Sequence, residues 1–202
     1  MFAEEICAVI LAGGRSRRMG RNKALLDIGG RPLIQTLAER LGTLARDIFV
    51  AANDPEAYRF LGLPVVADRF PGQGPLAGLH AVMSEHPRAY YVVAACDLPN
   101  LPTALLRRML DAAVADGIDA VIPRSLDGRA HPLSAVYRRT CLPVIEKALA
   151  AKANKVIETF LGGDGGGGGD ALSIRWFEQA EGAFAAADLL NVNTPEDLGR
   201  LP

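Results

Sequence analysis

The segment from residue 8 to residue 23 places the tightest constraint on the fold. It opens with an apolar run, Ala8-Val9-Ile10-Leu11-Ala12, which is typical of a buried strand. Gly13 and Gly14 follow directly, and paired glycines let the backbone turn tightly and approach a ligand closely. Backbone N–H groups in such a turn can bind an anion. The sequence therefore predicts a buried strand that ends in a phosphate-binding loop.

Basic side chains continue this loop, namely Arg15, Arg17, Arg18, Arg21 and Lys23. Their positive charge suits a triphosphate. The loop is no dinucleotide fingerprint, because it contains no G-x-G-x-x-G. It is no P-loop either, because Lys23 follows Gly20 by three residues and precedes Ala24. An arginine-rich surface loop is the alternative, but the particular spacing favours triphosphate binding.

The remainder of the chain alternates between strand and helix patterns. Apolar runs predict strands at 47–52, 65–67, 90–95 and 119–123, with an edge strand at 173–177, and helical spacing predicts helices at 32–44, 55–61, 76–85, 105–115 and 142–151. This alternation predicts an α/β fold: one three-layer α/β/α domain with a mostly parallel, Rossmann-like sheet. In such sheets, ligands bind beyond the carboxyl ends of the strands.

Four residues fall just past predicted strand ends: Gly13, Asn53, Asp68 and Asp97. We expect them to share one edge of the sheet. Asp97 follows the most strand-like segment, 90–95, and a carboxylate is the ligand that Mg²⁺ prefers. A helix-capping role for Asp97 is the alternative. Pro102 and Thr103 lie closer to the next predicted helix, so we favour a metal ligand.

Composition restricts the class of protein. A chain of 202 residues fits one domain, and its net charge of −1 offers no field that would attract nucleic acid or an anionic membrane. Cys7, Cys96 and Cys141 are odd in number and widely spaced, which predicts free thiols without a zinc or disulfide framework. Free thiols suit a reducing cytosol, and no signal peptide or membrane-spanning run is recognisable. We therefore expect a cytoplasmic protein.

Two further features are expected to be structural. A lone histidine in a loop, such as His131, is more often hydrogen-bonded than a general base, and His80 and His86 show no metal-ligand spacing. The glycine-rich run 162–170 predicts a surface loop without chemistry, because ordering glycine is entropically costly.

The pattern L-A-G-G-x-S-x-R-M-G-x-x-K, from Leu11 to Lys23, resembles the opening signature of the MobA-type nucleotidyltransferases. Three later segments match in order, G-P-L-A-G at 74–78, C-D-L-P at 96–99 and N-V-N-T-P-E-D-L at 191–198. These three segments narrow the resemblance to the molybdenum cofactor guanylyltransferases. The resemblance covers nearly the whole chain. The run 162–170 departs from that pattern.

The resemblance implies that GMP passes from GTP to the terminal phosphate of molybdopterin, with release of pyrophosphate and with Mg²⁺ as cofactor. It assigns catalysis to Arg18, Lys23 and Asp97, with Asp97 also the metal ligand. It assigns GTP binding to Leu11, Ala12, Gly13, Gly14, Lys23, Asn53, Asp68, Gly78 and Asp97. Asn191 and Asn193 match positions on the molybdopterin side. Within the single domain 1–202, residues 1–105 would bind the nucleotide and residues 106–202 the acceptor.

The reaction needs no deprotonating base, because a phosphate monoester with a second pKa of about 6 is already charged at neutral pH. We expect transient contacts with cofactor-handling proteins or target molybdoenzymes. Two alternatives stay open. A cytidylyltransferase or another small-molecule nucleotidyltransferase of the same superfamily is disfavoured by Pro75 and by the N-V-N-T-P segment. A regulator that binds nucleotide without turnover is disfavoured because Lys23 and Asp97 are intact.

Overall fold

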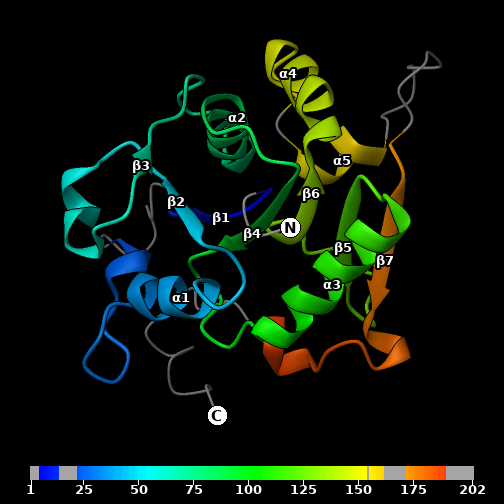
Figure 1. The fold of residues 1–202 in the computed structure, drawn as a ribbon, viewed down its shortest axis with the longest axis horizontal. Helices are drawn as coiled ribbons and strands as arrows, with labels where there is room; N and C mark the ends of the chain where they lie inside the picture. Colours follow the sequence, from blue (N-terminus) through cyan, green and yellow to red (C-terminus); the bar gives the residue numbers. More distant parts are fainter. Residues whose placement is uncertain (1–4, 14–21, 154, 162–171, 190–202) are drawn as a thin grey trace.

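The computed structural model describes residues 5–13, 22–153, 155–161 and 172–189. In this part of the chain a seven-stranded sheet has the order β3-β2-β1-β4-β6-β5-β7 (Figure 1). Its strands are β1 (Ile6–Leu11), β2 (Asp47–Ala51), β3 (Val65–Val66), β4 (Tyr90–Ala95), β5 (Ala120–Arg124), β6 (Ser134–Arg138) and β7 (Ile174–Glu178). The sheet is mostly parallel, as predicted, and β7 forms an edge, also as predicted.

Helices cover both faces of the sheet. They are α1 (Leu33–Leu41), α2 (Pro75–Glu85), α3 (Thr103–Asp116), α4 (Leu142–Ala150) and α5 (Val156–Leu161). Figure 1 shows α1 and α3 on one face, and α2, α4 and α5 on the other. Short 3-10 turns occupy Lys23–Leu25, Glu56–Leu61, Arg139–Cys141, Gln179–Glu181 and Ala186–Leu189. The predicted α/β/α layers are therefore confirmed.

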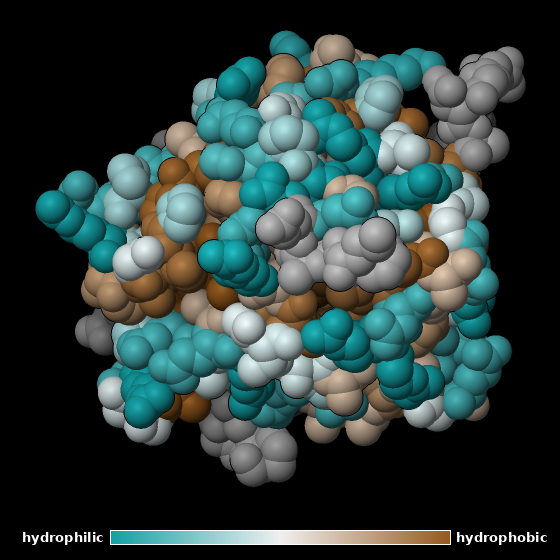
Figure 2. Space-filling model, in the orientation of Figure 1, coloured by the Kyte–Doolittle hydropathy of each residue, from teal (hydrophilic) through white to brown (hydrophobic). Residues whose placement is uncertain are grey.

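The two central strands explain why the sequence folds this way. Every residue of β1 and of β4 is buried, and both strands are continuous apolar runs, as expected where helices cover both faces. In α1, the buried residues Leu33, Ile34, Leu37 and Leu41 recur at helical spacing and face the sheet. Between the two helical layers, apolar side chains reach the surface in a band flanked by hydrophilic areas (Figure 2).

Strand β6 was not predicted. It pairs antiparallel with both β4 and β5, so it interrupts the parallel pattern. Its sequence, S-A-V-Y-R, is short and mixed in polarity, and no helix separates it from β5. Segment 125–133 joins the two strands instead of a crossover helix. Because β6 opposes both neighbours, β5 runs in the same direction as β4.

The register brings the strand ends together. Leu11 pairs with both Ala51 and Ala95, and Ala51 pairs with Val66. Ser134 lies opposite Ala94, so segment 125–133 shares the carboxyl edge of the sheet. In the described part of the chain, no helix has the length and apolar character needed to span a bilayer.

Candidate functional site

The structure brings together the residues predicted at the strand ends. Gly13, Asn53, Asp68 and Asp97 follow β1, β2, β3 and β4 at the same edge of the sheet. The other predicted site residues Gly14, Arg18, Asn191 and Asn193 lie outside the described residues, as does the glycine-rich run. Two hollows open at this edge, one on each side of β1 and β4, and they differ in size and lining.

The smaller hollow, of about 20 Å³, lies between β1, β2 and α2. Its lining combines glycines, alanines and one carboxylate, and it includes Leu11, Gly13, Asp68 and Gly78. A Cβ on Gly78 would lie 3.0 Å from Ala51 Cβ, so α2 approaches the sheet closely only because this residue is glycine. The hollow thus offers mainly backbone to a ligand.

The carboxylate of Asp68, in this hollow, accepts a hydrogen bond at only one of its two oxygens. Asn53 Nδ2 donates to Asp68 Oδ2 at 2.7 Å, and the backbone N–H of Asp68 donates to Asn53 Oδ1 at 2.9 Å. The second oxygen, Asp68 Oδ1, is buried and has no hydrogen-bond partner among the described residues. A buried carboxylate oxygen in this state calls for a donor from a ligand.

A buried tyrosine ties the ends of the glycine and arginine loop. Tyr58, in the 3-10 turn Glu56–Leu61, is 2 % exposed and donates its hydroxyl to Ala12 O at 3.0 Å. Asn22 Nδ2 donates to the same hydroxyl at 2.8 Å. Asn22 also accepts from the backbone N–H of Ala24 at 3.1 Å, which fixes the turn that carries Lys23. Sequence reasoning missed Tyr58, because no motif links it to the loop.

Asp97 lies in the turn after β4 and lines the larger hollow. Helix α3 begins only at Thr103, so Asp97 does not cap it. Burial raises the pKa of the Asp97 carboxyl, and the positive charges of Lys23 and Arg129 oppose that rise. Burial also raises the pKa of the neighbouring Cys96 thiol to about 12, so this thiol is protonated at neutral pH and is no nucleophile.

The donor set at Asp97 fits a metal that enters with a nucleotide. Within the described ranges, no group of three or more histidine, cysteine or acidic side chains is arranged to hold an ion. Mg²⁺ does not need such a group, because it is commonly held by one or two carboxylates together with substrate phosphates and water. Asp97 is an acid at this edge that could serve in that way, whereas one oxygen of Asp68 is already bonded to Asn53.

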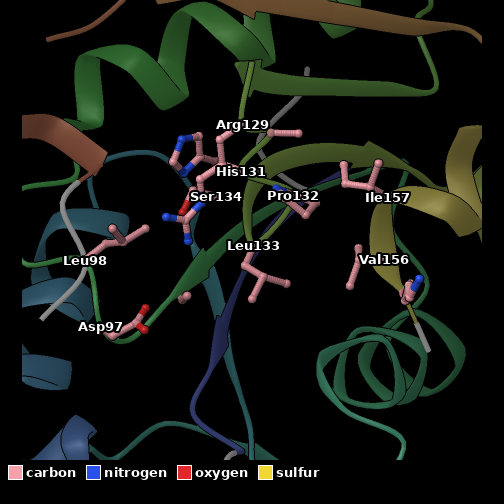
Figure 3. Close-up of a pocket in the computed structure, with 12 residues that line it drawn as sticks. Asp97, Leu98, Arg129, His131, Pro132, Leu133, Ser134, Val156 and Ile157 are labelled. Atoms are coloured by element: carbon pink, nitrogen blue, oxygen red, sulfur yellow. The ribbon is translucent and has the colours of Figure 1, made fainter. Parts of the chain in front are cut away.

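The larger hollow is a cavity of about 350 Å³ beside β4 and β6. It extends from Asp97 and Leu98 at one end to Val156 and Ile157 of α5 at the other (Figure 3). The polar residues in its lining are Asp97, Arg129, His131, Ser134 and Lys155. Sequence reasoning missed Arg129, Ser134 and Lys155, since they converge only through the unpredicted strand β6 and through α5.

His131 has both a structural contact and a place in the cavity wall. Its Nε2 lies 2.6 Å from Ser125 Oγ, so the prediction of a hydrogen-bonded histidine is confirmed. Burial lowers its pKa, the charge of Arg129 lowers it further, and Asp127 opposes both effects. The imidazole is therefore neutral at pH 7.

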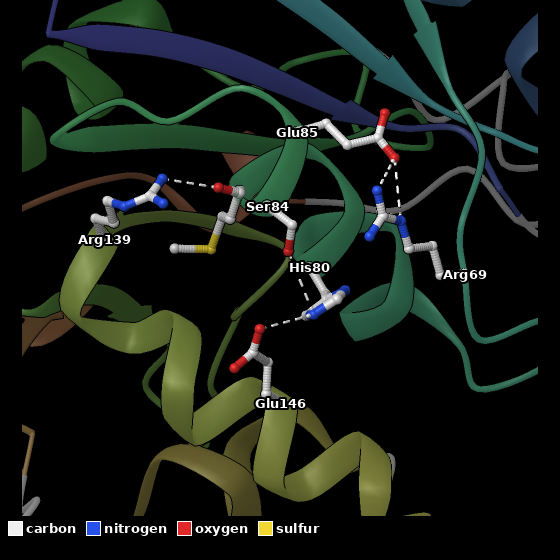
Figure 4. A network of polar contacts seen from close by, with 7 residues as sticks. Arg69, His80, Ser84, Glu85, Arg139 and Glu146 are labelled. Atoms are coloured by element: carbon white, nitrogen blue, oxygen red, sulfur yellow. Dashed lines mark hydrogen bonds and ion pairs between the residues drawn. The ribbon is translucent and has the colours of Figure 1, made fainter.

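A polar network fixes α2, whose first turn forms the wall of the smaller hollow (Figure 4). His80 Nε2 lies 3.4 Å from Glu146 Oε1 of α4 and 3.3 Å from Ser84 Oγ. Arg69 Nη2 contacts Glu85 Oε1 at 3.1 Å and so ties the loop after Asp68 to the same helix. The network positions the wall and does not line either hollow.

Known proteins are similar to this chain in sequence and in fold. The family model of the MobA-like NTP transferase domain matches residues 8–163. A probable molybdenum cofactor guanylyltransferase of Carboxydothermus hydrogenoformans is 38 % identical over 98 % of this chain and 95 % of its own. Another, of Pelotomaculum thermopropionicum, is 37 % identical over 94 % of this chain and 88 % of its own.

The crystal structure of molybdopterin-guanine dinucleotide biosynthesis protein A from Archaeoglobus fulgidus superposes with a TM-score of 0.76. It is 23 % identical, the match covers 96 % of each chain, and at that identity it supports the fold alone. The family model and the relatives settle the classification: the chain belongs to the MobA-like NTP transferase family.

Proposed function

We propose that this protein transfers GMP from GTP to the terminal phosphate of molybdopterin and releases pyrophosphate. The observation that carries the choice of base is Asp68, whose carboxylate is fixed by Asn53 and keeps one buried oxygen unpartnered. Guanine presents two donors side by side, N1–H and N2–H₂, and such a pair suits a carboxylate. Cytosine presents the acceptor N3 beside its single amino donor, and a carboxylate repels an acceptor.

The names of the relatives support the same reaction, since the two described above, which match nearly the whole chain, are named probable molybdenum cofactor guanylyltransferases. We place GTP against the opening of the smaller hollow, with the base at Asp68 and Gly78 and the phosphates near Gly13 and Gly14. Leu11 and Ala12 would border the nucleotide. Residues 1–105 would thus bind the nucleotide, and residues 106–202 the acceptor.

Charge on the phosphates has several proposed partners. Arg18 and Lys23 would offset charge on the β- and γ-phosphates. Asp97 would hold Mg²⁺, which when bound neutralises charge on the α-phosphate and the leaving pyrophosphate. Burial raises the pKa of Asp97 and the positive charge of Lys23 opposes that rise, which supports placing the two side chains at one reaction centre.

The acceptor would bind in the larger cavity, on the other side of Asp97, with Asn191 and Asn193 as further contacts to the pterin. In the reaction, an oxygen of the acceptor phosphate attacks the α-phosphorus, and the bond to pyrophosphate breaks. The attacking oxygen is already charged, so no protein group needs to remove a proton. We place this enzyme in the cytoplasm. There it would make transient contacts with cofactor-handling proteins or target molybdoenzymes.

A nucleotide panel tests the choice of base. With Mg²⁺ present, we expect GTP to raise the melting temperature clearly more than CTP does. Asp68→Asn should weaken GTP binding by roughly 10- to 100-fold, because it removes hydrogen bonds to a charged group. Asp111→Asn, an exposed acid on α3, is the matched control and should leave binding unchanged. Equal stabilisation by GTP and CTP in the wild type would rule out guanylyl transfer.

A further inference from the structure

The segment that joins β5 to β6, residues 125–133, is held rigidly at the edge of the larger cavity. Hydrogen bonds close it at four places: Ser125 N to Arg129 O (2.9 Å), His131 N to Pro123 O (2.9 Å), Ser134 N to His131 O (3.1 Å) and Tyr137 Oη to Pro132 O (2.7 Å). Tyr137 is fully buried in the core. A ligand that binds here would therefore meet a backbone that is already in place, which lowers the entropic cost of binding.

The hydroxyl of Ser134, in the cavity wall, is buried without a hydrogen bond to the described part of the protein. Ser134 is 1 % exposed, and its Oγ has no hydrogen-bond partner among the described residues. Most buried hydroxyls in native proteins are paired, so an unpaired one calls for an explanation. Figure 3 shows Ser134 beside His131, in the wall of the cavity. A polar group of a ligand would supply the missing partner.

A cation lies at the same end of the cavity. Arg129 is exposed, and the described part of the chain offers its guanidinium no hydrogen bond or ion pair. It lines the same cavity as Asp97 and His131. Lys155 is already engaged, because its Nζ lies 2.6 Å from Glu158 Oε1. Arg129 is thus the better placed of the two to receive an anion beside Asp97.

The rest of the wall suits a flat ring system. Leu133, Val156 and Ile157 supply apolar surface opposite the polar end (Figure 3). A volume of about 350 Å³ falls in the range of small-molecule sites, which combine apolar walls with a few placed polar groups. The cavity therefore matches a heterocycle that carries an anionic group at the end near Asp97.

We propose that the β5–β6 connection recognises the acceptor: Arg129 binds its terminal phosphate beside Asp97, while His131 and Ser134 bind the polar edge of its ring. The proposal rests on the function proposed above and assigns three residues to it. A phosphate held by Arg129 lies next to the place where Asp97 would bring the α-phosphate. The two reacting groups would then approach from opposite sides of Asp97.

Arg129→Gln tests the phosphate contact. We expect KM for molybdopterin to rise by roughly 10-fold or more, because a charge-assisted contact is lost. KM for GTP and the melting temperature should not change, since the wild-type side chain is exposed. Arg46→Gln is the matched control: Arg46 is also exposed, but it precedes β2 at the opposite edge of the sheet. If both variants behave alike, the phosphate contact is wrong.

Ser134→Ala separates recognition from structure. It removes a buried hydroxyl that lacks a partner, so the melting temperature should stay the same or rise. KM for molybdopterin should nevertheless rise by roughly 10-fold. Ser84→Ala is the control, because Ser84 Oγ lies 3.3 Å from His80 Nε2 and belongs to the α2 network. It should lower the melting temperature slightly and leave KM for molybdopterin unchanged. A Ser134→Ala enzyme with a normal acceptor KM would overturn the ring contact.

A binding measurement without GTP keeps the two proposals apart. We would titrate each variant with 6-hydroxymethylpterin phosphate, a stable pterin that carries one phosphate, and follow pterin fluorescence. Arg129→Gln and Ser134→Ala should both weaken binding relative to wild type. Weakened binding without any GMP transfer by the wild type would sustain the acceptor site and refute the guanylyl reaction. Normal GMP transfer by the wild type, with unchanged pterin binding in both variants, would sustain the guanylyl reaction and refute the acceptor site.

Discussion

The two hollows at the carboxyl edge of the sheet are built in different ways. The smaller one lies among parallel strands, and its lining of glycine, alanine and one carboxylate presents mostly backbone. The larger one lies beside the antiparallel strand β6, and side chains from β4, the β5–β6 connection and α5 line it. Under the proposed function, backbone in the smaller hollow would contact the phosphates and the Asp68 side chain would select the base, whereas side chains in the larger hollow would select the acceptor. Each hollow would thus recognise one substrate, by a different kind of wall.

Asp97→Asn should have the largest effect, because Asp97 is the proposed metal ligand at the reaction centre. The change keeps size but removes the charge that would hold Mg²⁺, so turnover should fall by roughly 10³-fold or more. GTP binding measured without metal should survive, since Asp68 and Gly13 are untouched. Pyrophosphate release across a magnesium titration measures the loss. Normal turnover at low magnesium would show that the metal is held elsewhere.

Lys23→Ala should affect the nucleotide side alone. We expect turnover to fall by roughly 10²-fold, because positive charge near the leaving pyrophosphate is lost. Binding of a pterin phosphate should not change. Lys147→Ala, an exposed lysine on α4, should behave as wild type. If Lys23→Ala weakened acceptor binding as well, Lys23 would act on both substrates and not on the nucleotide alone.

Asp119→Asn should lower stability without lowering activity. Asp119 lies at the amino end of β5, where it accepts from Ser173 N and Ser173 Oγ, both at 2.8 Å. Partial burial raises its pKa, but hydrogen bonds from Thr140 and Ser173 outweigh burial and bring the pKa below 3.8. At pH 7 the variant should lose about 1 kcal/mol, discounted for solvent screening, or roughly 2–4 °C in melting temperature.

The pH dependence of that loss has a definite sign. A depressed acid pKa stabilises the fold fully above the unfolded value of 3.8, and the contribution disappears as pH falls through the folded value. The gap in melting temperature between wild type and Asp119→Asn should therefore be constant near neutral pH and close below about pH 3.8. A gap that widens in acid, or a matching loss of turnover, would contradict this assignment.

Deleting residues 165–169 should have the smallest effect. The run connects α5, which lines the larger cavity, to the edge strand β7. Loop closure changes by roughly 0.6 kcal/mol for each doubling of length, so the melting temperature should move by less than about 2 °C. Acceptor KM and turnover should be unchanged. A large rise in acceptor KM would mean that this run contacts the acceptor.

The sequence was informative where the structure is local. Continuous apolar runs identified β1 and β4, and polar residues just past the strand ends predicted their common edge, because parallel strands align these ends. It was uninformative where distant segments meet. Tyr58 reaches Ala12 across 46 positions, and Ser134 faces the cavity only because β6 inserts beside β4. No residue pattern encodes such a meeting until the sheet order is known.

The antiparallel insertion has a consequence for how this fold can diversify. Residues 120–138 form one uninterrupted hairpin, and its tip lines the larger cavity while its strands are held by β4 and β7. Changes at the tip leave untouched β1, β2 and β3, at whose ends we propose that GTP binds. A related protein could therefore carry a different hairpin here and bind a different acceptor, while it transfers the nucleotide by the same reaction.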